Sequence, residues 1–348
     1  MCSIQSFILH VYSFALLQNS VASVTLMDIT HLKGRQTTTE RQFVDWTPGV
    51  EVKRVIIGDQ EIVFRVVNGR DVKLGEVPYQ ISFRRRLRMS RVYANFCGGT
   101  LITEKEVISA AHCFHRPSIT DLCGKSGRAP KELVVRTYAV AANLKTFDYF
   151  PKNDEEGSGQ WRALRDVYYP EEYDFPDHDV AVVFLQVAFI YNAYVAPLTM
   201  ATHYRDYEGL CTVSGFGRLS TQTMSPRLKI ADLRMIKAWY CDRIHKENMR
   251  SFICTSDEVS DIGKGDSGGP LVCKGTNDPN ETQYGVLVGI VSGKRIATRD
   301  GSFFVRVTSY KKFIIQKLLN NSTATLEISI EMFIITFLMC RIGVFKLS

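Results

Sequence analysis

The sequence predicts an all-β fold, and two observations support that prediction. Short runs rich in β-branched and aromatic residues recur between turn signals, among them 79–83, 107–110, 133–140, 180–185, 284–291 and 303–307. Many short strands without long helical periodicity are typical of sandwiches and barrels. The chain of 348 residues is also long enough for one large all-β unit, or for two packed barrels with tails.

The end of this region departs from the strand pattern. Tyr310, Phe313, Ile314 and Leu318 are spaced as one face of a helix, and two asparagines at 320 and 321 end the spacing. The sequence therefore predicts one C-terminal helix, over 308–320.

The two ends of the chain are predicted to lie outside the folded domain. Residues 1–23 are apolar and finish in small residues, Ala22 and Ser23, which predicts a signal peptide for secretion; a buried strand is the alternative, because no basic n-region precedes the apolar run. Residues 321–348 form an apolar tail of unknown role. Its longest apolar run, 332–340, is short of the roughly 20 residues that span a bilayer. We expect an appended segment or a gene-model error here in preference to a membrane anchor; a membrane-tethered protein is the alternative.

Composition and charge exclude several classes of function. The net charge of +7 is modest for this length, and no recognisable nucleic-acid-binding motif accompanies the basic residues. The basic run 84–88, with Arg91, favours a solvated face over an exosite for an acidic partner. The acidic run 154–156 lacks the ligand spacing of an oxygen cage, so we expect no metal, and nothing implies a cofactor.

Cysteine usage favours an exported protein. Of nine cysteines, Cys2 lies in the predicted signal and Cys340 in the tail, which leaves seven, so that six can pair and one remains. No Cys-x-x-Cys occurs, which argues against a zinc knuckle or a thioredoxin-like site. Sequons at Asn280, Asn320 and Asn321 also fit an exported glycoprotein.

The most informative motif is Gly265-Asp266-Ser267-Gly268-Gly269-Pro270. A nucleophilic serine needs an exposed, tight turn and backbone amides that converge on the developing oxyanion. Glycines on both sides allow that turn and a close approach of substrate. The alternative, a glycine-rich hairpin with an ordinary serine, is weakened by two further motifs.

These motifs place a histidine and a carboxylate at strand ends. Ser109-Ala110-Ala111-His112-Cys113 follows an apolar run, and Asp177-His178-Asp179 precedes another, 180–183. In the order His, Asp, Ser, the three motifs resemble those of the chymotrypsin-like (trypsin-fold) serine proteases over about residues 66–320. The resemblance implies two packed antiparallel β-barrels, about 66–196 and 197–305, followed by the C-terminal helix and with the triad in the cleft between the barrels.

The resemblance also implies a role for each catalytic residue. Ser267 attacks the scissile carbonyl, and His112 takes its proton and later gives it to the leaving amine. Asp179 holds the imidazole; it, not Asp177, matches the motif because it directly precedes the apolar strand. The amides of Gly265 and Ser267 form the oxyanion hole.

Activation of a zymogen is implied in the same way. Cleavage after Arg65 by an activating protease would separate a pro-segment, 24–65, from a new amino terminus at Val66, which would pair with Asp266. Arg54-Val55 has a similar appearance, but only Arg65 is followed by the run into 76–80 that resembles the family.

By resemblance, the implied disulfides are Cys97–Cys113, Cys211–Cys273 and Cys241–Cys254, which leaves Cys123 over. In the implied specificity pocket, Asp261 occupies the position of the aspartate that binds Arg or Lys in trypsin-like members, and Ser292 matches the serine of the substrate-binding strand. The pocket departs from the family because Gly263 replaces a cysteine whose partner is also missing, and Gly293 replaces a tryptophan.

The sequence thus predicts a secreted, extracellular serine endopeptidase that prefers Arg or Lys before the scissile bond. Its expected partners are protein or peptide substrates, an activating protease and protein inhibitors. The alternative is a weakly active or inactive homologue that acts as a binding or regulatory protein, which the altered pocket wall favours and the full set of triad residues opposes.

Overall fold

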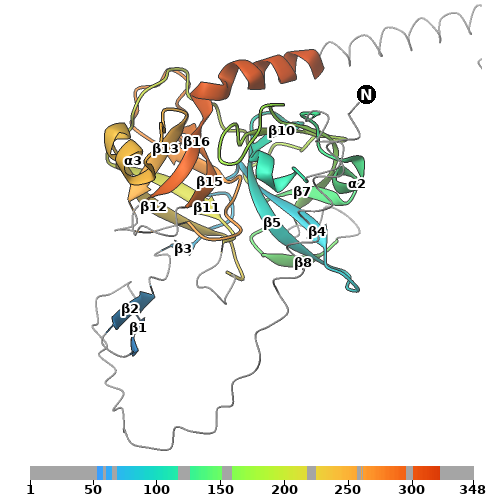
Figure 1. The fold of residues 1–348 in the computed structure, drawn as a ribbon. Helices are drawn as coiled ribbons and strands as arrows, with labels where there is room; N and C mark the ends of the chain where they lie inside the picture. Colours follow the sequence, from blue (N-terminus) through green and yellow to red (C-terminus); the bar gives the residue numbers. More distant parts are fainter. Residues whose placement is uncertain are drawn as a thin grey trace, which may run out of the picture.

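The structure is a computed structural model. It describes residues 69–116, 126–150, 159–217, 225–256, 260, 262–294 and 301–321, together with the backbone of two earlier strands. Those strands, β1 (Lys53–Ile57) and β2 (Gln60–Phe64), pair as an antiparallel hairpin. The remaining strands form two antiparallel barrels that lie side by side (Figure 1).

The first barrel is a closed sheet of six strands in the order β4-β7-β9-β10-β6-β5, and pairing of β4 with β5 closes it. A short strand, β8, extends the sheet beyond β5. The bounds are β4 (Gln80–Arg86), β5 (Val92–Leu101), β6 (Glu106–Ser109), β7 (Thr137–Ala141), β8 (Phe147–Tyr149), β9 (Gln160–Tyr168) and β10 (Ala181–Leu185).

The second barrel has the order β11-β14-β15-β16-β13-β12 and is closed by pairing of β11 with β12. Strand β3 (Arg70–Asp71) joins it at β12, so the chain touches the second barrel before it enters the first. The bounds are β11 (Leu210–Gly215), β12 (Lys229–Ile236), β13 (Phe252–Ser256), β14 (Pro270–Cys273), β15 (Val286–Lys294) and β16 (Ser302–Arg306), with helix α3 (Ala238–His245) between β12 and β13.

Side-chain patterns along the strands explain their places. Strand β10 lies between β9 and β6, and all five of its residues are buried, in keeping with its continuous apolar run. Strand β12 instead alternates: Ala231, Leu233 and Met235 are buried, whereas Asp232 and Arg234 between them face solvent. The all-β prediction with two barrels is confirmed.

Two of the helical segments bear on the sequence predictions. The predicted strand over 133–140 is shorter than expected, because α2 (Lys131–Val134) occupies its beginning and β7 starts only at Thr137. Pro130 precedes this helix and its carbonyl accepts the amide of Leu133 at 3.0 Å, which favours a turn over an extended strand. At the end of the domain, a 3-10 turn (Val307–Tyr310) leads into a helix over 311–321, which confirms the C-terminal helix.

The prediction about the basic run 84–88 can be compared with the structure, whereas the tail beyond residue 321 lies outside the described residues. The basic run is not one solvated face: Arg84 is fully buried and Arg85 stacks 3.7 Å over the ring of Phe96, while the arginines at 86, 88 and 91 are exposed. Within the described residues, no helix is both long and apolar enough to cross a membrane.

Candidate active site

Strand pairing brings His112 and Asp179 together. His112 lies in a 3-10 turn (Ala111–Cys113) just after β6, and Asp179 lies just before β10. Strands β6 and β10 are antiparallel with Ala181 opposite Ser109, so the end of one meets the start of the other. Two motifs far apart in sequence therefore meet at one end of the first barrel.

Asp179 is held by three donors. Its Oδ1 accepts the backbone amide of His112 at 2.8 Å, and its Oδ2 lies 2.8 Å from His112 Nδ1 and accepts the Ser292 hydroxyl at 2.5 Å. The Asp179 side chain is fully buried, and a buried carboxylate needs such donors to remain charged. A neutral imidazole that donates from Nδ1 to this carboxylate leaves Nε2 free to accept a proton.

The neighbouring acidic and basic residues face elsewhere. His178 has a left-handed backbone (φ +57°), its amide donates to the Tyr310 hydroxyl at 3.2 Å, and its ring lies edge-on to that of Tyr310. Asp177 is exposed. Of these three consecutive residues, Asp179 is the one that hydrogen-bonds to His112.

The Ser267 segment is shaped by its backbone. Gly265 (φ +114°) and Gly268 (φ +77°) adopt conformations that favour glycine. The Ser267 carbonyl accepts the Gly98 amide at 2.7 Å, and the Gly268 amide donates to Val291 at 2.8 Å. The half-buried Ser267 is thereby fixed between β5 of the first barrel and β15 of the second.

Ser267 also lies beside the histidine motif. The Sγ atom of Cys113, the residue after His112, lies 3.9 Å from the Ser267 carbonyl oxygen. No hydrogen bond joins the Ser267 hydroxyl to His112 in the described part of the chain. Catalytic hydrogen bonds are often long without substrate and tighten in the Michaelis complex.

Asp266 has a buried carboxylate that fits against two glycines. Its Oδ1 accepts the Gly217 amide at 2.6 Å, and its Oδ2 accepts the Gly263 amide at 2.8 Å. A Cβ on Gly215 or Gly217 would lie only 2.1 or 2.2 Å from an Asp266 oxygen. The expected cleavage site, Arg65 and Val66, lies outside the described residues.

The wall beside Ser292 is lined by aromatic rings that sequence reasoning missed. A Cβ on Gly293 would lie 2.7 Å from the Phe303 ring and 3.2 Å from the Phe175 ring. Phe175 is 53% exposed, and its ring lies edge-on to His112 with centroids 5.7 Å apart. Its position four residues before Asp179 was the available signal. The expected pocket residue Asp261 lies outside the described residues.

The cysteine pairs expected from the resemblance are bonded. Disulfides join Cys97 to Cys113, Cys211 to Cys273 and Cys241 to Cys254. The first of them ties the turn that carries His112 to strand β5. Cys123 lies outside the described residues.

Comparisons with known proteins agree with this geometry. A family model described as Trypsin matches residues 66–314. The chain is 28% identical to rat (Rattus norvegicus) Transmembrane protease serine 9 over 72% of its length, and 26% identical to mouse (Mus musculus) Kallikrein-11 over 74%. It is also 26% identical to Serine protease filzig of Drosophila melanogaster over 72%. The matches span 22% of the rat protein, 83% of the mouse protein and 14% of the fly protein. The chain belongs to the trypsin family of serine endopeptidases.

Proposed function

We propose that this chain is a secreted endopeptidase, synthesised as a zymogen, in which His112, Asp179 and Ser267 form the catalytic triad. The observation that supports it most is the 2.8 Å contact between His112 Nδ1 and a fully buried Asp179. That pairing orients an imidazole as a general base beside the serine motif. The disulfides and the apolar segment 1–23 support export.

In the proposed reaction, His112 Nε2 accepts the proton of the Ser267 hydroxyl as the oxygen attacks the scissile carbonyl. Asp179 stabilises the imidazolium that forms. The amides of Gly265 and Ser267 donate to the oxyanion of the tetrahedral intermediate. The same imidazolium then protonates the leaving amine, and water hydrolyses the acyl-enzyme by the reverse proton path.

Activation by cleavage after Arg65 fits the arrangement of the hairpin. Arg54 lies within a paired strand, opposite Val63, whereas Arg65 directly follows the last residue of β2. A protease binds its substrate as an extended chain, so a bond already paired within a hairpin is a poorer target. The new amino group of Val66 is proposed to pair with Asp266.

Preference for Arg or Lys before the scissile bond is the proposed specificity. A carboxylate at Asp261, on a pocket floor shielded from water, would attract a cationic side chain strongly. Ser292, the proposed serine of the substrate-binding strand, lies on β15. Two features favour the alternative of a binding protein with little turnover: the small Gly293 on the pocket wall, and the absence of the family's pocket cysteines.

The decisive experiment cleaves the zymogen after Arg65, labels it with a fluorophosphonate and profiles it on a peptide library varied before the scissile bond. Ser267→Ala is the control. Labelling and cleavage after Arg or Lys, both absent in the control, would support the proposal. Cleavage after other residues would retain the triad but overturn the specificity. Folded protein that neither labels nor cleaves would favour the binding-protein alternative.

A further inference from the structure

Strand β4 contains an arginine in an unusual setting. Arg84 is fully buried, and none of the described residues forms an ion pair with it. Its guanidinium lies near the rings of Trp161 (5.1 Å) and Phe216 (5.9 Å), and it donates from Nη2 to Asn143 Oδ1 at 3.2 Å and to the Lys145 carbonyl. Burial lowers the pKa of Arg84 to about 10, so the group stays charged at neutral pH.

A buried chain of hydrogen bonds leads from this cation to the nucleophile segment. Arg84 Nε donates to the Ser82 hydroxyl at 3.0 Å, and that hydroxyl donates to Asn95 Oδ1 at 2.8 Å. Asn95 Nδ2 then donates to the Gly265 carbonyl at 3.2 Å. Ser82 and Asn95 are both buried. In each of these three bonds, the donor is on the side of Arg84 and the acceptor is on the side of Gly265. The bonds are therefore aligned, and each one strengthens the polarisation of the next.

The chain ends at a peptide that matters for catalysis. The Gly265 carbonyl belongs to the peptide between Gly265, a proposed oxyanion donor, and Asp266. Strand β5 therefore binds the carbonyls on both sides of Asp266: Gly265 through the Asn95 side chain, and Ser267 through the Gly98 amide at 2.7 Å. This peptide lies between the two peptides that carry the proposed oxyanion donors, the amides of Gly265 and Ser267. Fixing its carbonyl therefore restrains the backbone that sets the direction of both amides.

We propose that Arg84, Ser82 and Asn95 are positioning residues that hold the oxyanion loop in its working conformation. This inference rests on the proposed function, because it assigns the Gly265 amide to the oxyanion hole. We name these three residues the β4–β5 relay.

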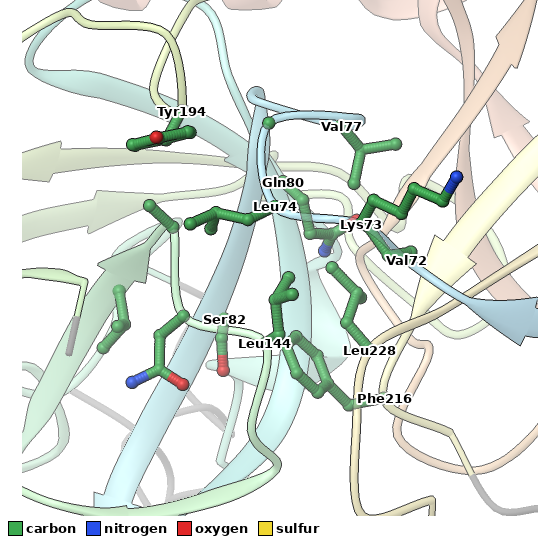
Figure 2. A pocket seen from close by; sticks show the side chains of 14 residues that line it. Val72, Lys73, Leu74, Val77, Gln80, Ser82, Leu144, Tyr194, Phe216 and Leu228 are labelled. Atoms are coloured by element: carbon green, nitrogen blue, oxygen red, sulfur yellow. The ribbon is translucent and has the colours of Figure 1, made fainter. Parts of the chain in front are cut away.

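The surroundings argue against a purely structural role. Ser82 and Phe216 line a small cavity whose walls include the apolar Leu144 and Leu228 as well as the polar Gln80 and Asn143 (Figure 2). A buried cation without a paired carboxylate is a poor source of stability, and apolar residues of similar volume often replace buried charges without loss. Because Arg84, Ser82 and Asn95 are all shielded from water, the electrostatic effect of the charge along the relay is stronger than it would be in solvent.

The test compares Asn95→Ala, the near-isosteric Asn95→Asp, Arg84→Met and the double variant Arg84→Met with Asn95→Ala. Arg162→Met is the matched control, since it removes another buried arginine of the first barrel whose donors go to Gln160, Trp161 and Ala188. We expect kcat to fall about tenfold in each Asn95 variant, less than the loss of a direct oxyanion donor, with KM nearly unchanged. A peptide aldehyde, which forms a tetrahedral adduct with Ser267, should lose affinity by the same factor.

We expect Arg84→Met to change kcat in the same direction but less, and the double variant to lose little more than Asn95→Ala alone. Amide hydrogen exchange over 263–269 should accelerate in all relay variants and remain unchanged in Arg162→Met. Unchanged kcat and unchanged exchange in folded Asn95→Asp would overturn the relay. Exchange needs no turnover, so it tests the relay even if the wild type fails to react with a fluorophosphonate, which would count against the proposed function alone.

Discussion

The two barrels hold their shares of the active site by different means. On the first barrel, the reactive group is held through the Asp179 side chain, which accepts the His112 backbone amide and pairs with the His112 imidazole, and which also accepts the Ser292 hydroxyl from β15 of the second barrel. On the second barrel, Ser267 itself is held by the backbone: its carbonyl accepts the Gly98 amide, and the next amide, of Gly268, donates to the Val291 carbonyl. A side chain such as Asp179 can be replaced by one of the same shape, which changes the chemistry and leaves the fold intact. A backbone turn has no such replacement, so a substitution there changes the conformation as well.

This contrast predicts that substitutions in the two barrels affect turnover and folding differently. Substitutions around Asp179 should preserve the fold and reduce turnover. Substitutions around Ser267 that disturb backbone packing should affect folding and turnover together. The following variants test that separation in order of decreasing expected effect.

Asp179→Asn should have the largest effect, because it removes the charge that stabilises the imidazolium and favours the wrong tautomer of His112. We expect kcat to fall by about 10⁴, with little change in melting temperature, in steady-state kinetics and thermal unfolding. Asp177→Asn is the control, since that exposed side chain does not contact His112. An equal loss in both variants would contradict the assignment of Asp179.

Gly268→Ala tests the backbone side, with Gly209→Ala as its match. The two glycines have nearly equal φ angles (+77° and +78°), but a Cβ at 268 would lie 2.2 Å from Ser109 Oγ, whereas one at 209 meets nothing within 4 Å. Both variants bear a left-handed strain of about 1–2 kcal/mol. Overpacking adds about 1–3 kcal/mol to Gly268→Ala alone, with loss of activity.

Thermal unfolding and fluorophosphonate labelling measure the two effects. A Gly268→Ala protein as stable as Gly209→Ala, and fully reactive, would show that the segment tolerates a different turn. In that case, the contrast between the two barrels would not hold.

Local sequence motifs predicted much of this arrangement, because each motif couples a reactive residue to a strand end or a turn. The residues that flank His112 and Asp179 form β6 and β10, and the antiparallel pairing of those strands makes the two motifs meet. The fold class followed from the same strand runs. The start of the predicted strand at 133–140 was wrong, because Pro130 initiates a helical turn that a β-rich composition does not reveal.

Long-range burial could not be predicted in this way. A run of arginines gives no sign that Arg84 points inward, because its aromatic neighbours, Trp161 and Phe216, come from distant parts of the chain. Asn95 is an ordinary polar residue in sequence, and only the close approach of β5 to the Ser267 segment brings it to the Gly265 carbonyl. Such contacts depend on tertiary packing and not on local pattern.

Ser292→Ala removes one of the donors to Asp179 and leaves two. A hydrogen bond to a charged group contributes about 1.5–3 kcal/mol, so we expect kcat to fall by about 10- to 100-fold, well short of Asp179→Asn. Ser126→Ala, at an exposed site, is the control. A loss as great as that of Asp179→Asn would mean that Ser292, and not the His112 pairing, maintains the carboxylate.

Phe175→Ala should have the smallest effect, and on binding more than on turnover. The half-exposed ring lies edge-on to His112 and covers Gly293, so it offers apolar surface beside the proposed site without contributing to proton transfer. Loss of about 1 kcal/mol of apolar contact would raise KM several-fold and leave kcat nearly unchanged. Phe147→Ala, a similarly exposed phenylalanine on β8, controls for the loss of a surface ring. A drop in kcat without a change in KM would instead make Phe175 part of the support for His112, and the side-chain network of the first barrel would then extend beyond Asp179.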